Sequence, residues 1–202
     1  MQGGVWRLFT APFINYGFMQ LIESIFFQMI IGFMIETSIG TARMAAFYTL
    51  LLVGAGFFAC VCTPEYACGF DLPILGLLGG MVALLIVNHK TFPKPALLLG
   101  GLLIFMLLLI TLLMMASASE YNDIFRAFSF YALPDWYGAL GGFFFGLFSG
   151  LMIMPAKRSV RVAQPKSERM IKFAGMGMTV IWLAIFIPVF YFAVDRPGYE
   201  VK

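Results

Sequence analysis

Residues 69–80 of this chain read GFDLPILGLLGG and give the clearest indication of its fold. The segment is apolar after Asp71, and Gly76 and Gly80 lie four residues apart. On a helix this spacing puts both glycines on one face, where another helix backbone can come close. Asp71 stands at the start, where a carboxylate can cap the helix and complement its dipole. The stretch therefore predicts a helix that packs tightly against a second helix.

A later stretch has the same pattern and supplies the second helix: residues 136–150 read WYGALGGFFFGLFSG. Gly142, Gly146 and Gly150 recur every four residues, so they form a stripe along one helical face. We expect this stripe to meet the glycine pair of residues 69–80. Such close packing is a main source of helix association in lipid. General small-residue packing predicts the same contact, so the stripe indicates the fold more than the function.

The composition of the whole chain places these helices in a membrane. The chain has 202 residues, of which 61% are hydrophobic and 11% are charged, and its mean hydropathy is +0.93. Soluble domains are ~25% charged, so too few polar residues remain here to cover a water-facing surface. The net charge of +3 is too small to indicate nucleic-acid binding. We expect an integral multi-pass membrane protein, in the mitochondrial inner membrane or in a membrane of the secretory pathway.

Six apolar segments are long enough to cross a hydrocarbon core of ~30 Å as helices of about 20 residues. Helices are expected because backbone polar groups in lipid must be satisfied within each segment. Six Lys and Arg residues fall in residues 156–172, and this side should face the cytosol or the mitochondrial matrix. The expected spans lie near residues 18–35, 43–62, 72–89, 95–116, 136–155 and 171–194.

Four motifs in this order resemble those of the rhomboid family, whose active members are intramembrane serine proteases. The likeness covers about residues 5–155 and implies a rhomboid-like bundle of transmembrane helices. No single motif is decisive, and the resemblance depends on their shared order and spacing. The motifs are WRLFTAPFINYG at residues 6–17, the set Gly32, Glu36, Gly40 and Arg43, and the glycine-rich stretches at 69–80 and 138–150.

The resemblance also predicts where the bundle departs from the family pattern. The family's first helix should precede Trp6, and we expect six spans without it. The span at 171–194 would correspond to the extra C-terminal helix of many eukaryotic members. The expected organisation is a membrane core at 1–155, a basic loop at 156–170, and a C-terminal transmembrane helix with a short tail at 171–202.

None of the family's catalytic positions carries the family's residue in this chain. By resemblance, the serine nucleophile corresponds to Asp71 and the histidine base to Ala139. The histidine and asparagine that stabilise the oxyanion correspond to Gln20 and Ser24. Acyl transfer needs a nucleophile with an adjacent base, and alanine has no ionisable group. The resemblance therefore predicts a chain that is not an enzyme.

Other chemistry has little support in the sequence. An aspartyl protease needs two paired carboxylates, and no motif supports a pairing of Glu23 with Asp71. We interpret Glu23 as a carboxyl group near the membrane interface that bonds to a neighbouring loop, and the alternative is a proton or ion site. The single histidine, His89, and the three cysteines show no recognised ligand spacing, so we expect no metal and no other cofactor.

Two cysteines are candidates for a disulfide bridge. Cys62 and Cys68 flank the sequence TPEYA, on the expected non-cytosolic side of the membrane, where disulfides can form. The alternative is that both are small buried hydrophobic residues.

The basic segment carries a separate hypothesis. Lys157, Arg158 and Arg161 are candidates to contact lipid headgroups at the membrane surface. The same charges also set the topology, and both roles are compatible.

A chain that resembles a protease in fold but lacks its catalytic residues is expected to bind other molecules and not to cleave them. We interpret the chain as a structural or accessory subunit of a larger membrane protein complex. The alternative is a pseudoprotease that binds transmembrane clients in trafficking or quality control, and an active peptidase has the least support. We expect other transmembrane proteins and lipids as partners, with no nucleic acid and no small-molecule substrate. Bulky side chains of the first span should pack against a partner: Phe26, Phe27, Met29 and Phe33.

Overall fold

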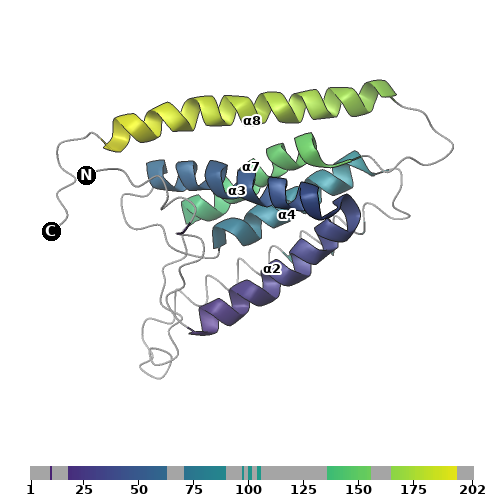
Figure 1. Cartoon of the computed structure of the whole chain (residues 1–202), viewed down its shortest axis with the longest axis horizontal. Helices are drawn as coiled ribbons and strands as arrows, with labels where there is room; N and C mark the ends of the chain where they lie inside the picture. The colour runs from purple at the N-terminus through teal and green to yellow at the C-terminus, as the bar shows by residue number, and fades with distance from the viewer. Residues whose placement is uncertain are drawn as a thin grey trace.

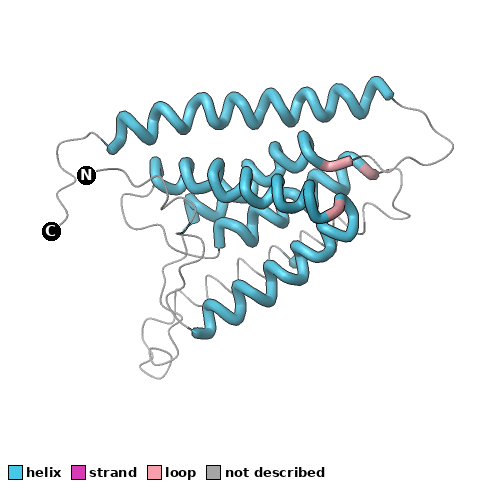
Figure 2. The backbone as a smooth tube through the Cα atoms, in the orientation of Figure 1, coloured by secondary structure: helices cyan, strands magenta, loops and turns pink. Residues whose placement is uncertain are grey.

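The chain is described here by a computed structural model, which covers residues 10, 18–62, 71–89, 97, 100–101, 104–105, 136–155 and 165–194. Within these residues the chain is helical apart from short turns, as the sequence predicted (Figure 2). The longer helices in this part of the chain are α2 (Phe18–Ile39), α3 (Thr41–Cys62), α4 (Asp71–Val87), α7 (Trp136–Ile153) and α8 (Pro165–Val194).

These helices coincide with five of the six expected spans. The remaining span, near 95–116, lies mostly outside the described residues, although Leu97 and Phe105 within it are helical. The number of spans therefore stays a prediction. Two described helices are long and apolar enough to cross a membrane, Thr41–Cys62 and Arg169–Phe192, and shorter apolar helices cover Ser24–Ile39, Pro73–Val87 and Gly138–Ile153.

The start of α8 differs from the sequence prediction. We expected a loop as far as residue 170, but the helix begins at Pro165. Proline suits the first helical turn because its fixed φ is already helical and its missing N–H needs no partner there. Apolar character alone does not reveal a charged extension, and Lys and Arg are good helix formers. The helix therefore continues beyond its apolar part by more than one turn.

A tight turn at Gly40 joins α2 to α3. Gly40 has a φ of 87°, in the left-handed region that glycine adopts without strain. Its N–H donates to the carbonyl oxygen of Glu36 at 2.7 Å. The hydroxyl of Thr41 donates to the carboxylate of Glu36 at 2.6 Å. Gly40 alone connects the two helices, so α3 reverses direction and packs against α2.

The centre of the bundle is α4. Every residue from Pro73 to Gly80 is buried, and the helix contacts α2, α3 and α7. Its most extensive contact is with α7, and α8 packs on α3 and α7. Figure 1 shows α8 and α2 on opposite sides of the group formed by α3, α4 and α7.

Glycines bring the backbones of α4 and α7 into contact. A Cβ atom added at Gly146 would overlap the carbonyl oxygen of Gly76 and lie 2.8 Å from its carbonyl carbon. One turn later, a Cβ atom at Gly150 would lie 3.2 Å from the Cα atom of Gly80. Gly79, which the four-residue spacing did not single out, also lies against the backbone of α7. The glycine stripe of α7 therefore lies against the backbone of Gly76 and Gly80, while a Cβ atom added at either of these two would meet α3, at Leu51 or Phe47.

Aromatic side chains attach α8 to α3 and α7. The indole N–H of Trp182 donates to the carbonyl oxygen of Gly54 at 3.1 Å. Its ring stacks on Phe58, with centroids 5.1 Å apart. Aromatic pairs contribute about 0.5–1.5 kcal/mol beyond the area that they bury. We name the group around this indole the α8 aromatic cluster; it consists of Phe58, Phe145, Phe148, Trp182 and Phe186.

Candidate functional site

Asp71 and Ala139, which the sequence resemblance aligns with the catalytic dyad, lie at the same end of a packed helix pair. Asp71 is the first residue of α4, and Ala139 lies in the first turn of α7. The helices run parallel, because Gly76 meets Gly146 and the next glycine of each stripe also meets its counterpart. Ala139 is 1% exposed, while the side chain of Asp71 lies outside the described residues. At residue 139, α7 therefore has a buried methyl group, which cannot accept a proton.

The two positions that correspond to oxyanion stabilisation lie on α2. Gln20 is in its first turn, and the side chain of Gln20 lies outside the described residues. Ser24 follows one turn later and is 5% exposed. Because α2 packs against α4, the helix with Gln20 and Ser24 lies beside the helix that begins at Asp71. The fold thus brings α2 and α7 together on α4.

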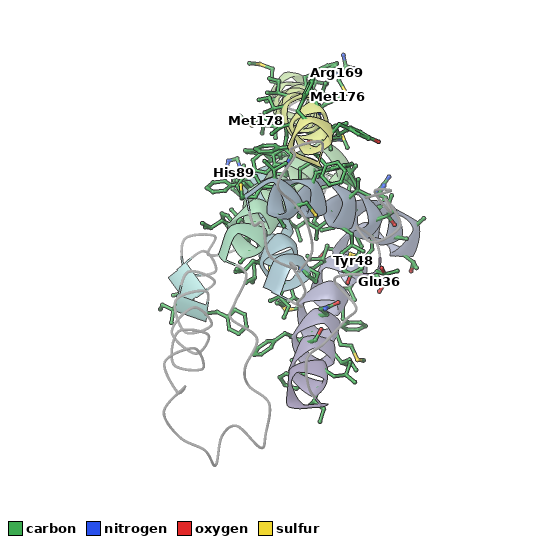
Figure 3. The ribbon with its side chains drawn as sticks, turned by 90° about the vertical axis from the view of Figure 1, so that its left-hand side faces the viewer. Glu36, Tyr48, His89, Arg169, Met176 and Met178 are labelled. Carbon is green, nitrogen blue, oxygen red and sulfur yellow. The ribbon has the colours of Figure 1, made fainter. Side chains whose placement is uncertain are left out.

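Ser24 belongs to a chain of hydrogen bonds between α2 and α3. Its hydroxyl oxygen accepts a hydrogen bond from Nε2 of Gln28 at 2.7 Å. The Oε1 atom of Gln28 accepts a hydrogen bond from the hydroxyl of Tyr48 at 2.7 Å. Figure 3 shows Tyr48 where α3 faces α2. Buried polar groups need such partners, so the Ser24 hydroxyl serves the packing of α2 in this structure.

Gln28 and Tyr48 were not among the predicted site residues. The four-residue spacing of Ser24 and Gln28 is a signal that could have identified their contact, because residues four apart are neighbours on a helix. Nothing in the local sequence links Gln28 to Tyr48, which comes from the next helix. The sequence therefore predicts only some of the hydrogen-bond partners of the polar side chains of α2.

Asn88 links the end of α4 to the end of α7, at the opposite end of this helix pair from Asp71 and Ala139. Its side chain is 2% exposed, and Nδ2 donates to the carbonyl oxygens of Leu84 at 3.1 Å and Pro155 at 3.2 Å. The neighbouring His89 is exposed, and its Nδ1 lies 3.0 Å from the carbonyl oxygen of Ile86. Since α4 runs from Asp71 to this end, His89 lies at the opposite end of the helix from Asp71.

Several predicted sites involve residues that the structure does not describe. The bridge from Cys62 needs Cys68, and the headgroup contacts need residues 157–161, so these stay predictions. The role of Glu23 also stays a prediction, because its side chain is not described. Among the described residues, no group of three or more His, Cys, Asp or Glu side chains could hold a metal ion.

The rhomboid domain model matches residues 2–156 of the chain. The chain belongs to the rhomboid family. RHOMBOID-like protein 5 of Arabidopsis thaliana is 28% identical over 94 residues, and this alignment covers 45% of the chain but only 30% of that relative. No solved structure matches the chain significantly.

Membership of the rhomboid family accounts for the features described above. It explains the all-helical architecture and identifies the chain as a membrane protein. The matched region ends at residue 156, just after α7, so α8 follows the rhomboid domain in the sequence. The α8 aromatic cluster nevertheless joins α8 to two helices of that domain.

Proposed function

We propose that this rhomboid does not cleave proteins and acts as a structural or accessory subunit of a larger membrane protein complex. The observation that carries the proposal is Ala139, a buried methyl group at the histidine position of a helix that is closely packed on α4. A serine or other hydroxyl nucleophile needs an adjacent base, and this position supplies none. The remaining scaffold is suited to holding helices in place for a binding role.

An exposed surface of α2 supports the binding role. Phe26, Met29 and Phe33 are 57%, 68% and 67% exposed, and their spacing places them on one helical face. Phe27, which we grouped with them, packs within the chain against Phe105, with ring centroids 5.8 Å apart. The rings of Phe26 and Phe27 touch edge to face, with centroids 5.6 Å apart, but Phe27 is half-buried and only Phe26 is exposed. We name Phe26, Met29 and Phe33 the α2 outer surface.

The proposal predicts that the chain neither cleaves substrates nor reacts with serine-directed probes. The purified full chain should leave a rhomboid-type transmembrane substrate intact, because Asp71 and Ala139 cannot form a serine–histidine pair. A fluorophosphonate should label an active rhomboid in a parallel reaction but not this chain. Covalent labelling of Ser24 would refute the non-catalytic assignment.

Restored variants provide the control for this prediction. Asp71→Ser with Ala139→His should stay inactive, because Gln20 and Ser24 remain and the loss of one oxyanion donor costs about 10²–10³ in kcat. The imidazole must also fit where Ala139 is 1% exposed. Adding Gln20→His and Ser24→Asn supplies the family's full set of residues. Activity of the double variant within about tenfold of an active rhomboid would contradict the prediction.

A second prediction is that a foreign transmembrane helix contacts the α2 outer surface. A photoreactive amino acid at Met29 or Phe33 should form protein adducts in native membranes, since bulky apolar side chains pack well against a neighbouring helix. The same group at Phe27 is the matched control, because this side chain faces Phe105 and should give no foreign adduct.

The adducts and the size of the extracted protein separate the possible roles. Adducts with lipid alone at Met29 and Phe33 would count against a partner. Co-migration with a large complex after gentle detergent extraction supports the subunit role. A mostly free monomer supports the alternative, a pseudoprotease that binds transmembrane clients.

A further inference from the structure

The first turns of α8 carry a concentration of positive charge. Residues 156–172 contain six Lys or Arg residues and one acidic residue, Glu168. Three of the basic residues, Lys166, Arg169 and Lys172, belong to α8 and recur every three residues. Arg169 is exposed and Lys172 is half-buried, while the side chains of Lys166 and Glu168 lie outside the described residues. At this end of α8 the structure therefore places an exposed arginine.

Arg169 lies beyond the end of α7. A Cβ atom at Gly175 would lie 2.7 Å from the Cβ atom of Leu151 and 2.8 Å from the backbone nitrogen of Met152. The two helices run antiparallel, because the α8 aromatic cluster, further along α8, meets an earlier part of α7. Arg169 comes six residues before Gly175, about 9 Å along the axis, whereas α7 ends at Ile153. Figure 1 shows this end of α8 projecting past α7.

Exposed apolar side chains continue from Arg169 along α8. Phe173 and Met176 follow Arg169 by four and seven residues, and they are 66% and 43% exposed. Val180 extends the same row and is 58% exposed. Figure 3 shows Arg169 and Met176 on the side of α8 that points away from the other helices. A guanidinium group at the end of an apolar row matches a phospholipid, whose phosphate lies above its acyl chains.

We propose that the start of α8 binds the headgroup of an anionic phospholipid through Arg169. Phe173, Met176 and Val180 then contact an acyl chain of the same lipid. Arginine suits this role because its planar guanidinium can donate two parallel hydrogen bonds to a phosphate. The positive charge of Arg169 favours a lipid with net negative charge over a zwitterionic one.

A role in topology alone would not require this arrangement. Topology depends on the number of Lys and Arg residues near a span, whatever side of a helix they occupy. Here Arg169 is aligned with an exposed apolar row, which a lipid needs and a topology signal does not. The inference requires a membrane location, and it is independent of the subunit role proposed above.

The test measures which lipid stays bound to the purified full chain. The chain in mild detergent is mixed with equal amounts of phosphatidylglycerol and phosphatidylcholine that carry identical acyl chains, and native mass spectrometry gives the ratio of bound lipids. The wild-type chain should retain more phosphatidylglycerol. Arg169→Gln should lower this ratio about fivefold, which corresponds to about 1 kcal/mol for one basic side chain near an anionic headgroup.

Arg43→Gln is the matched control. Arg43 is exposed and lies at the same end of the bundle, because α3 and α8 run parallel: Gly54 meets Trp182, and Phe57 meets Phe190. This variant should keep the wild-type lipid ratio. An equal fall in both variants would mean that general surface charge, not the face of α8, selects the lipid, and it would overturn the proposal.

Two further measurements use the wild-type chain alone. Salt at about 1 M should remove the preference for phosphatidylglycerol, because the Debye length then falls to about 3 Å. Glycerol phosphate, which has a phosphate but no acyl chain, should not displace the bound lipid. Displacement by glycerol phosphate would indicate a site for free phosphate, and an equal retention of both lipids would indicate no headgroup selection. Either result overturns the proposal.

Discussion

Gly146→Ala should destabilise the helix bundle by about 3 kcal/mol or more. The added Cβ atom would overlap the carbonyl oxygen of Gly76 and lie 2.9 Å from its Cα atom. A backbone atom cannot rotate away as a side chain can, so α7 would have to move off α4 along much of their contact. Overpacking costs typically 1–3 kcal/mol, and a clash with backbone belongs at the upper end of that range. The melting temperature of the purified chain in detergent should fall by about 6–12 °C.

Gly177→Ala is the matched control for this effect. It makes the same chemical change on α8, where no described atom lies within 4 Å of an added Cβ atom. Alanine is also the better helix former, so the melting temperature should stay the same or rise slightly. If both variants lost the same stability, the close approach of α4 and α7 would not be the cause.

The central helix pair could be predicted because its signal is local. Glycines four residues apart lie on one face of a helix whatever surrounds it, and the spacing on α7 correctly indicated that Gly146 closely approaches another helix, at Gly76 of α4. The spacing on α4 did not show that the face of Gly76 and Gly80 meets α3, or that Gly79 is the glycine facing α7. The start of α8 could not be predicted in this way. A search for apolar segments finds only the apolar part of a helix. The first turn of α8, which begins at Pro165, carries charged residues and precedes the apolar part of the helix.

For the candidate site, the sequence predicted which chemical groups are present, but it did not predict which side chains contact one another. The identity of Ala139 is enough to exclude a proton acceptor at that position, and the structure adds that the methyl group is buried. The hydrogen bonds from Ser24 through Gln28 to Tyr48 depend on how α2 and α3 are aligned. The turn at Gly40 sets that alignment, and no spacing within one helix reveals it.

The way in which α8 packs on the bundle could not be predicted from the sequence either, because Trp182 has partners on two other helices. Its indole packs against Phe58 of α3 and Phe148 of α7, and its N–H reaches the carbonyl oxygen of Gly54. Each of these partners lies more than 30 residues away along the chain. An isolated tryptophan within an apolar span is therefore not distinguishable from one that faces lipid until the helices are assembled.

Trp182→Ala should release α8 from the bundle. The substitution removes a hydrogen bond to α3 and the ring contacts of the α8 aromatic cluster. A fully buried Trp→Ala change costs about 3–5 kcal/mol, and since Trp182 is only partly buried we expect about 3 kcal/mol, at the lower end of that range. A protease site placed in the segment between α7 and α8 allows a direct measurement. After cleavage in detergent, the wild-type α8 fragment should stay with the other helices during affinity purification, and the Trp182→Ala fragment should be lost.

Two controls separate the ring of Trp182 from its N–H group and from general apolar character. Trp182→Phe keeps an aromatic ring and removes the donor to Gly54, so it should cost only about 1 kcal/mol and leave the fragment bound. Ile181→Ala removes a neighbouring side chain that is 59% exposed and should leave the fragment bound as well. Retention of the Trp182→Ala fragment would contradict the prediction, because α8 would then be held by its remaining contacts with α7, such as that of Gly175 with Leu151.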